Sequence, residues 1–314
     1  MNEVRTSFFK ALFGVAKADP RVILLTADMG FNLLERFRDE LPTQYVNSGI
    51  SEANTMSMAA GMALAGKKPF VYSITPFVTY RCLEQIRVDI CYHNIGVKIV
   101  GVGSGLDYAQ SGSTHQPTED ISIMRSMPNM QVVCPSDSLE AATLPAAICN
   151  LKSPVFVRLG RGKEPAIYSQ PPKMQVGKGI PIFSSKGSGK RIAILATGNI
   201  VYNAYLAAKQ IASGDIPVDI FSVPWIKPLD ERLVLEQAQS SNLLVTIEEH
   251  SEIGGLRSAV CETLSKNGVC ANFRYISLPD AFQKTVGDQE YLRKLNGLDA
   301  KSIASRISDW ASRL

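Results

Sequence analysis

The stretch GISEANTMSMAAGMALAG (residues 49–66), followed by KPFVYSI (68–74), indicates the fold class. The first segment is rich in alanine and methionine, as is typical of a buried helix. The second is a short apolar run rich in β-branched and aromatic residues, as is typical of a buried strand. A helix that leads directly into an apolar strand predicts a parallel sheet covered by helices.

The same alternation continues through the chain in two series. Further apolar strands are predicted at 22–28, 97–103, 130–136 and 154–160, and then at 191–198, 218–224, 243–250 and 271–279. A segment rich in glycine, proline, serine and lysine separates the two series and predicts a linker. The chain of 314 residues is also too long for one typical domain. We therefore predict two parallel-sheet α/β domains, at 1–165 and 190–314, joined by a linker at 166–189.

Composition excludes several classes of partner. The chain is 45% hydrophobic and 20% charged, which is typical of a globular protein. Its net charge is only +4 and its basic residues are scattered, so no nucleic acid partner is expected. No apolar run is long enough to span a membrane, and the N-terminus has the pattern of an amphipathic helix. The six cysteines show no metal spacing, which favours free thiols in the cytoplasm.

Candidate functional residues follow the predicted strands, because ligands of open α/β sheets bind beyond the carboxyl ends of the strands. Each has an ordinary alternative, such as a first-turn acid, a core aromatic or a surface arginine. The glycines at 101–105 are not followed by a helix, which argues against a dinucleotide site. The residues at this edge are Asp28, Glu52, Phe77, Tyr80, His115 and Arg161.

Five strings carry a resemblance to a known family. They are GISEANTMSMAAGMALAG, TPFVTY, SGSTHQPTEDISIMRSMPNMQVVCPSD, RLGRG and IEEHSEIGGLRSAV. In this order and spacing they resemble the C-terminal half of transketolases, most specifically over residues 47–161. The resemblance implies a pyrimidine-binding domain followed by the family's smaller C-terminal domain. It also implies one subunit of a split, two-chain transketolase, which transfers a two-carbon ketol unit between sugars by means of thiamine diphosphate.

The resemblance gives the carboxylate at the start of the apolar helix a catalytic role. Glu52 matches the family's glutamate, which holds the aminopyrimidine of the cofactor so that its imino form can deprotonate the thiazolium carbon to the ylide. An apolar setting fits this role because it strengthens the hydrogen bond of a carboxyl group. Phe77 matches the aromatic residue that stacks on the pyrimidine, with Ile74 and Tyr80 as its neighbours by spacing. Asp28 matches an acid near the cofactor and the subunit contact.

The substrate residues are assigned in the same way. His115 matches a catalytic histidine that faces the sugar hydroxyls, where an imidazole can donate a hydrogen bond or carry a proton. Arg161 matches an arginine that binds the sugar phosphate, a role that suits a guanidinium. Arg158 is expected beside it, and Arg5 stands where a second phosphate-binding arginine would fall.

Two departures from the family pattern concern the substrate. Many transketolases have an acid four residues before this histidine, which reads a substrate hydroxyl, and this chain has Ser111 there. They also have a histidine where this chain has Gly103. A site that lacks these polar groups loses discrimination for the hydroxyls they pair with. We therefore expect a deoxy, branched or otherwise modified sugar in place of the usual pentose phosphates.

The GDG motif with which thiamine enzymes hold diphosphate and metal does not occur in this sequence. Because these groups need oxygen ligands and backbone donors, we expect no metal ligand in this chain. An N-terminal transketolase subunit with the GDG motif would hold the diphosphate and Mg²⁺ or Ca²⁺, in an α2β2 heterotetramer. Three alternatives stay open: the β subunit of a 2-oxoacid dehydrogenase, a deoxyxylulose-phosphate-synthase-like enzyme, and a non-catalytic scaffold subunit.

Overall fold

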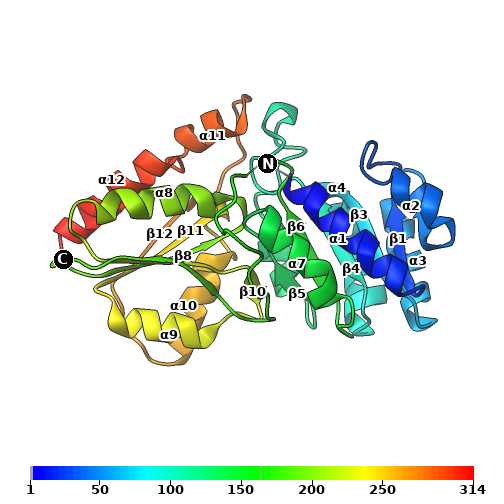
Figure 1. Cartoon of the computed structure of the whole chain (residues 1–314), viewed down its shortest axis with the longest axis horizontal. Helices are drawn as coiled ribbons and strands as arrows, with labels where there is room; N and C mark the ends of the chain where they lie inside the picture. Colours follow the sequence, from blue (N-terminus) through cyan, green and yellow to red (C-terminus); the bar gives the residue numbers. More distant parts are fainter. Residues whose placement is uncertain (1–2, 163) are drawn as a thin grey trace.

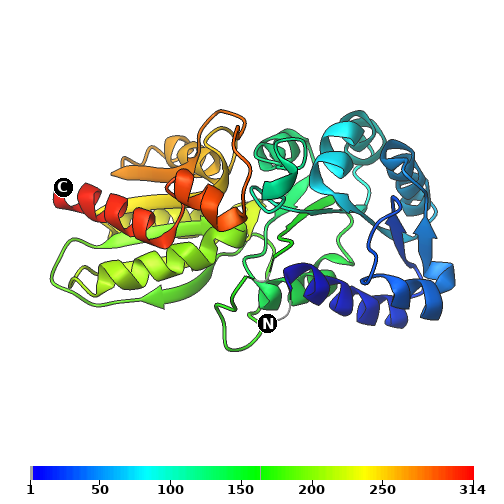
Figure 2. The same ribbon diagram turned by 90° about the horizontal axis from the view of Figure 1, so that it is seen from above.

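The structure is a computed structural model that describes residues 3–162 and 164–314. It contains two α/β domains that lie side by side, one from each half of the chain (Figures 1 and 2). Each domain has its own sheet, of seven strands in the first and five in the second. Almost all neighbouring strands are parallel, and only one edge strand of each sheet is antiparallel. The predicted fold class is therefore confirmed.

The first sheet has the strand order β10-β5-β6-β4-β3-β1-β2. Its inner strands β1, β4 and β6 are buried along their whole length, because helices cover both faces. The strands contributed by the N-terminal half are β1 (Val22–Thr26), β2 (Tyr45–Asn47), β3 (Lys68–Ile74), β4 (Lys98–Val102), β5 (Gln131–Val133) and β6 (Val155–Leu159).

Two apolar clusters cover the faces of this sheet. Consecutive strand residues such as Leu24 and Leu25 belong to different clusters, because successive side chains of a strand point to opposite faces of the sheet. One cluster contains residues of α1 and α7, and the other contains residues of α3 and α6. The helices of this domain are α1 (Val4–Ala18), α2 (Glu35–Glu40), α3 (Glu52–Leu64), α4 (Thr75–Thr79), α5 (Leu83–Gln85), α6 (Asp120–Ser126) and α7 (Ser138–Ile148).

The second sheet has the strand order β12-β11-β8-β9-β7. Figure 1 shows α8 and α12 along one face of it, and α9 and α10 along the other. Its strands are β7 (Ile180–Ser184), β8 (Ile192–Thr197), β9 (Val218–Ser222), β11 (Leu243–Ser251) and β12 (Phe273–Leu278). Its helices are α8 (Val201–Ala212), α9 (Glu231–Ser240), α10 (Leu256–Lys266), α11 (Gln289–Leu295) and α12 (Ala300–Ser312).

Two edge strands lie where the sequence did not predict them. β7 falls inside the predicted linker and pairs with β9 in antiparallel orientation. The sequence did not indicate this strand, because the glycine and proline residues around its alternating apolar residues are typical of a linker. β10 (Trp225–Lys227) follows β9 in the chain but pairs with β5 of the first sheet. A strand from the second half of the chain thus joins the sheet of the first domain. The domain limits at 1–165 and 190–314 stay a prediction.

The segment after β3 is an irregular series of short helices. After α4, a 3-10 turn spans Tyr80–Cys82, α5 follows, and a π-helix spans Ile86–Tyr92. The turns of a π-helix are wider than those of an α-helix and are frequent at functional sites. None of the helices in the described part of the chain is both long and apolar enough to cross a membrane.

Candidate active site

Glu52 is the first residue of α3 and lies where the chain turns from β2 into that helix. Ser48 holds this turn: its backbone N–H donates to the Thr26 carbonyl, and its hydroxyl lies 2.5 Å from that of Thr55. The Glu52 side chain is only 4% exposed, and one of its carboxylate oxygens lies 2.8 Å from Nη1 of Arg81. The buried carboxylate therefore has a fixed position and an arginine as its partner.

From this arginine, a series of stacked groups leads to the end of β6. The guanidinium carbon of Arg81 lies 4.7 Å from the centre of the Phe77 ring. Phe77 meets the imidazole of His115 edge to face, with 5.2 Å between ring centres, and His115 lies 5.9 Å from the Tyr108 ring. The guanidinium carbon of Arg161 lies 4.8 Å from the centre of the same tyrosine ring. We call these residues, together with Glu52, the site series.

Four other predicted residues lie around the site series. Ile74 precedes α4 and packs half-buried against the apolar cluster of α1. Tyr80 follows α4, and burial raises the pKa of its hydroxyl far above the usual range. Ser111 is exposed in the loop that carries the histidine. Asp28 is exposed beyond β1 and exchanges hydrogen bonds with Asn47. Whether these four residues contact cofactor or substrate stays a prediction.

Arg158 lies apart from the open site, although Arg161 is only three residues away. Its side chain is 1% exposed, and its Nε lies 2.7 Å from a carboxylate oxygen of Asp120. Its Nη2 donates to the carbonyl oxygens of Pro117 and Glu249, both at 3.1 Å. Because the guanidinium is buried and makes three hydrogen bonds within the chain, this arrangement favours a structural role over the predicted contact with substrate.

The loop after β4 carries the histidine and is folded around a half-buried carboxylate, that of Asp107. Asp107 accepts hydrogen bonds from the backbone N–H of Ser104 at 3.0 Å and from that of Arg161 at 2.8 Å. Gly103 has a φ of 86°, and a Cβ atom there would clash with the Tyr108 ring. The tyrosine ring thus occupies the space that a side chain at position 103 would need.

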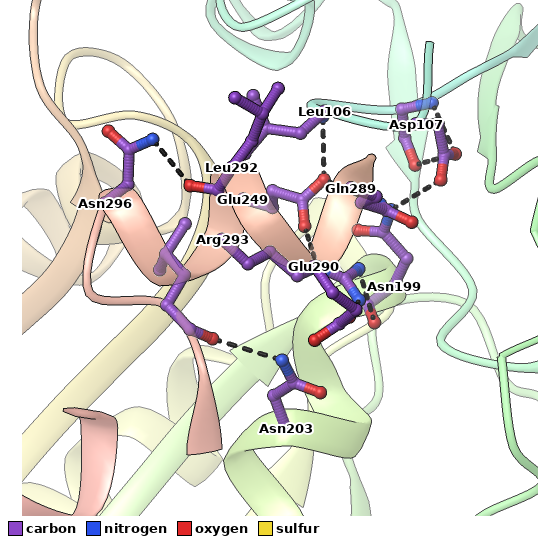
Figure 3. Close-up of polar contacts among 12 residues, drawn as sticks. Leu106, Asp107, Asn199, Asn203, Glu249, Gln289, Glu290, Leu292, Arg293 and Asn296 are labelled. Atoms are coloured by element: carbon purple, nitrogen blue, oxygen red, sulfur yellow. Dashed lines mark hydrogen bonds and ion pairs between the residues drawn. The ribbon is translucent and has the colours of Figure 1, made fainter. Parts of the chain in front are cut away.

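The C-terminal domain holds this loop from the other side (Figure 3). Glu249, near the end of β11, accepts a hydrogen bond from the backbone N–H of Leu106 at 2.7 Å. Its other oxygen lies 2.5 Å from Nε of Arg293 in α11. Asn199 reaches the same loop with its amide nitrogen 3.3 Å from Asp107. Side chains of the second domain therefore position the loop that carries the histidine.

Three carboxyl groups pair with the guanidinium of Arg293: Glu164 at 3.3 Å, Glu249 at 2.5 Å and Glu290 at 2.6 Å. The carboxyl group of Asp107 also lies close enough to interact with this cluster. Burial raises the pKa of Glu164 to about 7, although Arg293 acts against this shift. Burial also raises the pKa of Asp107, and the charge of Glu249 adds to that effect. Glu164 therefore keeps its proton at a pH where carboxyl groups in water are ionised.

Sequence reasoning missed several of these residues. Arg81 follows the TPFVTY string directly, and Tyr108 lies in the glycine-rich loop, so both stood next to recognised signals. Glu249 lies in the IEEH string, but nothing in the sequence indicated that its side chain reaches the first domain. Arg293 had no sequence signal, because its role depends on how the two domains meet.

Family models match both domains of the chain. The model described as the transketolase pyrimidine-binding domain matches residues 2–165, and the transketolase C-terminal domain matches residues 184–303. One subunit of the apulose-4-phosphate transketolase of Phocaeicola vulgatus is 33% identical over 98% of this chain and 97% of its own length. A 6-deoxy-6-sulfo-D-fructose transketolase subunit of a Clostridium species is 36% identical over 99% of this chain and 95% of its own.

A solved structure agrees with these matches. It is described as an inactive β4 tetramer of a split-gene transketolase, and it superposes with a TM-score of 0.86 at 32% identity. The superposition covers 98% of this chain and 97% of that one. The chain thus belongs to the transketolase family, in which it comprises the pyrimidine-binding domain and the C-terminal domain.

Proposed function

We propose that this chain is the pyrimidine-binding subunit of a split transketolase that uses thiamine diphosphate to transfer a two-carbon ketol unit between sugar phosphates or modified sugars. The observation that carries the proposal is the site series, in which Glu52, Phe77, His115 and Arg161 lie in one continuous line of contacts. A buried carboxylate, an aromatic face, an imidazole and a terminal cation are the groups that this chemistry requires.

The residues present fit the aminopyrimidine half of the cofactor. A flat, nitrogen-bearing group, the guanidinium of Arg81, already lies against both the Glu52 carboxylate and the Phe77 ring. The same two side chains can therefore hold a flat heteroaromatic ring that carries hydrogen-bond donors. When bound, thiamine diphosphate would supply the carbon nucleophile for the ketol unit.

The chain's own residues would then move and hold protons. Glu52, whose side chain is 4% exposed, would keep its carboxyl group on the ring nitrogen of the aminopyrimidine. Phe77 would fix the plane of that ring. His115, beside Phe77, would donate a hydrogen bond to the carbonyl oxygen of the sugar and pass a proton as that oxygen changes charge.

The substrate side of the site supports a modified sugar. Arg161 would bind a terminal anionic group, such as a phosphate, at the far end of the site series. Ser111 replaces an acid of the family pattern, and the Tyr108 ring takes the space beside Gly103 where the family has a histidine. This end of the site is therefore less polar than the family pattern. The two relatives named for apulose-4-phosphate and 6-deoxy-6-sulfo-D-fructose support the same interpretation.

A partner subunit would complete the cofactor site. In the described part of the chain, no three His, Cys, Asp or Glu side chains are grouped so that they could hold a metal ion. We propose that an N-terminal transketolase subunit with a GDG motif holds the diphosphate and Mg²⁺ or Ca²⁺, in an α2β2 assembly in the cytoplasm. The inactive state of the similar β4 tetramer supports the need for such a partner.

Reconstitution with the partner tests the proposed function. The mixed subunits are expected to transfer ketol units, and this chain alone is not. Glu52→Gln should lower kcat of the assembled enzyme by about 10²- to 10⁴-fold, the usual contribution of a proton-transfer group. The assembly with the Glu52→Gln subunit should elute at the same volume as the wild-type assembly in size-exclusion chromatography. Full activity of the isolated chain would refute the need for a partner.

The same assembly separates the alternatives. Decarboxylation of pyruvate without ketol transfer between sugars would favour a 2-oxoacid dehydrogenase or a deoxyxylulose-phosphate-synthase-like enzyme. Unchanged turnover after Glu52→Ala would favour a scaffold subunit. Efficient use of xylulose 5-phosphate would contradict the modified-sugar interpretation without affecting the role of Glu52.

A further inference from the structure

Arg81 makes two contacts at once, one with a buried carboxylate and one with an aromatic ring. Nη1 lies 2.8 Å from a carboxylate oxygen of Glu52, and the guanidinium carbon lies 4.7 Å from the centre of the Phe77 ring. These are the two side chains that we assign to the aminopyrimidine. A guanidinium is flat and carries N–H donors at its edge, as an aminopyrimidine does. The arginine thus uses the contacts that the cofactor ring needs.

The two partners of this ion pair differ in their freedom to move. The Glu52 side chain is 4% exposed, whereas the Arg81 side chain is 49% exposed. Among the described residues, the Arg81 guanidinium makes one hydrogen bond, the one to Glu52. A long side chain with one exposed half can turn into water, while the buried carboxylate cannot follow it and needs a new partner in its place. The pair can therefore open by movement of the arginine alone.

We propose that Arg81 is an internal occupant of the aminopyrimidine site and that the cofactor must displace it. This inference rests on the proposed function, because it assigns the aminopyrimidine to Glu52 and Phe77. Before the cofactor is bound, the arginine satisfies a buried carboxylate that would otherwise lack a partner. When the cofactor binds, the guanidinium leaves both contacts and its charge moves toward solvent.

The displacement has a measurable consequence. If only a fraction of molecules has the site free of the arginine, the apparent dissociation constant of the cofactor is raised by the reciprocal of that fraction. Removal of the guanidinium should therefore tighten binding, because every molecule then has an open site. An arginine that helped to hold the cofactor would have the opposite effect. The direction of the change distinguishes the two roles.

The experiment is titration of the reconstituted two-subunit enzyme with thiamine diphosphate at saturating metal, followed by isothermal titration calorimetry. We expect Arg81→Met, which keeps an apolar stem without the charge, to lower the dissociation constant about five- to tenfold, as for a site occupied about 80–90% of the time. Arg81→Ala should act in the same direction. An unchanged or larger dissociation constant in both variants would overturn the inference.

Arg36→Ala is the matched control. Arg36 also lies over a phenylalanine, 4.1 Å from the ring centre of Phe13, and pairs with Glu40 at 2.9 Å. It is not part of the site series, so its removal should leave the dissociation constant unchanged. If the wild-type assembly shows no saturable binding of thiamine diphosphate, the proposed function fails. If binding is saturable but Arg81→Met does not tighten it, only the inference about Arg81 fails.

Discussion

Gly103 shows how one backbone position shapes the substrate end of the site. Its φ of 86° lies in the region that favours glycine, and the Tyr108 ring fills the space beside its Cα. That ring contacts both His115 and Arg161. The sequence showed that a family histidine is missing here, but it could not show that a tyrosine from five residues later takes its space.

Gly103→Ala is expected to destabilise the chain by about 1–3 kcal/mol, because the new methyl group combines an unfavourable φ with a clash against the Tyr108 ring. Urea denaturation measures this loss. Gly14→Ala is the control, since Gly14 lies in α1 with no atom within 4 Å of its missing Cβ. That change should stabilise the chain by about 0.5–1 kcal/mol. An equal effect of both substitutions would contradict the assigned strain.

The end of β6 carries two arginines with different surroundings. Arg158 is buried on the strand and joins it to α6 through Asp120, while Arg161 lies just beyond the strand and is exposed. Sequence reasoning named both as substrate residues, because spacing places them near the site but does not report burial. The loop after the strand turns the second arginine outward through its backbone bond to Asp107.

Arg158→Ala is expected to cost about 3–5 kcal/mol of stability, because it leaves the buried Asp120 carboxylate without its partner. Arg161→Ala should change stability by less than about 0.5 kcal/mol, as for a surface residue. In the assembled enzyme, Arg161→Ala should instead raise KM for a phosphorylated substrate with little change in its Tm. Loss of stability in both variants, or in neither, would contradict this division.

The succession of helices and strands was largely predictable, and the exceptions have physical reasons. Buried parallel strands such as β4 are continuous apolar runs, which a sequence displays directly. β10 pairs with a strand from the other domain, so its partner lies about ninety residues away and leaves no local pattern. The π-helix at Ile86–Tyr92 shifts the helical period within one segment. Arg81 lies in the 3-10 turn at Tyr80–Cys82, just before this π-helix. Its contact with Glu52 was not predicted, because a sequence pattern does not show such a turn.

The contact between the domains concentrates carboxyl groups in a buried place. Burial raises the pKa of Glu164 from its ordinary 4.5 to about 7. Between these values the folded chain keeps a proton that the unfolded chain has lost. The contribution of this group to stability is therefore fully present below about pH 4.5 and is lost as the pH rises toward about 7.

Glu164→Gln should remove this dependence, because the amide resembles the protonated carboxyl group at every pH. We expect the unfolding free energy of the variant, relative to the wild type, to rise by up to about 3 kcal/mol between about pH 5 and about pH 8. Urea denaturation at several pH values measures the difference. Glu40→Gln is the control, since Arg36 lowers the pKa of this exposed carboxyl group so that it titrates below this window. A difference that stays constant with pH would contradict the raised pKa of Glu164.

The most direct test of the assigned cofactor site is a structure of the reconstituted two-subunit enzyme with thiamine diphosphate bound. The quantity to measure is the distance from the Glu52 carboxylate to the ring nitrogen of the aminopyrimidine. We expect a hydrogen bond of about 2.6–3.2 Å, with the ring against Phe77 and the guanidinium of Arg81 turned away. An aminopyrimidine bound elsewhere, with Glu52 still paired to Arg81 or facing water, would contradict the assignment.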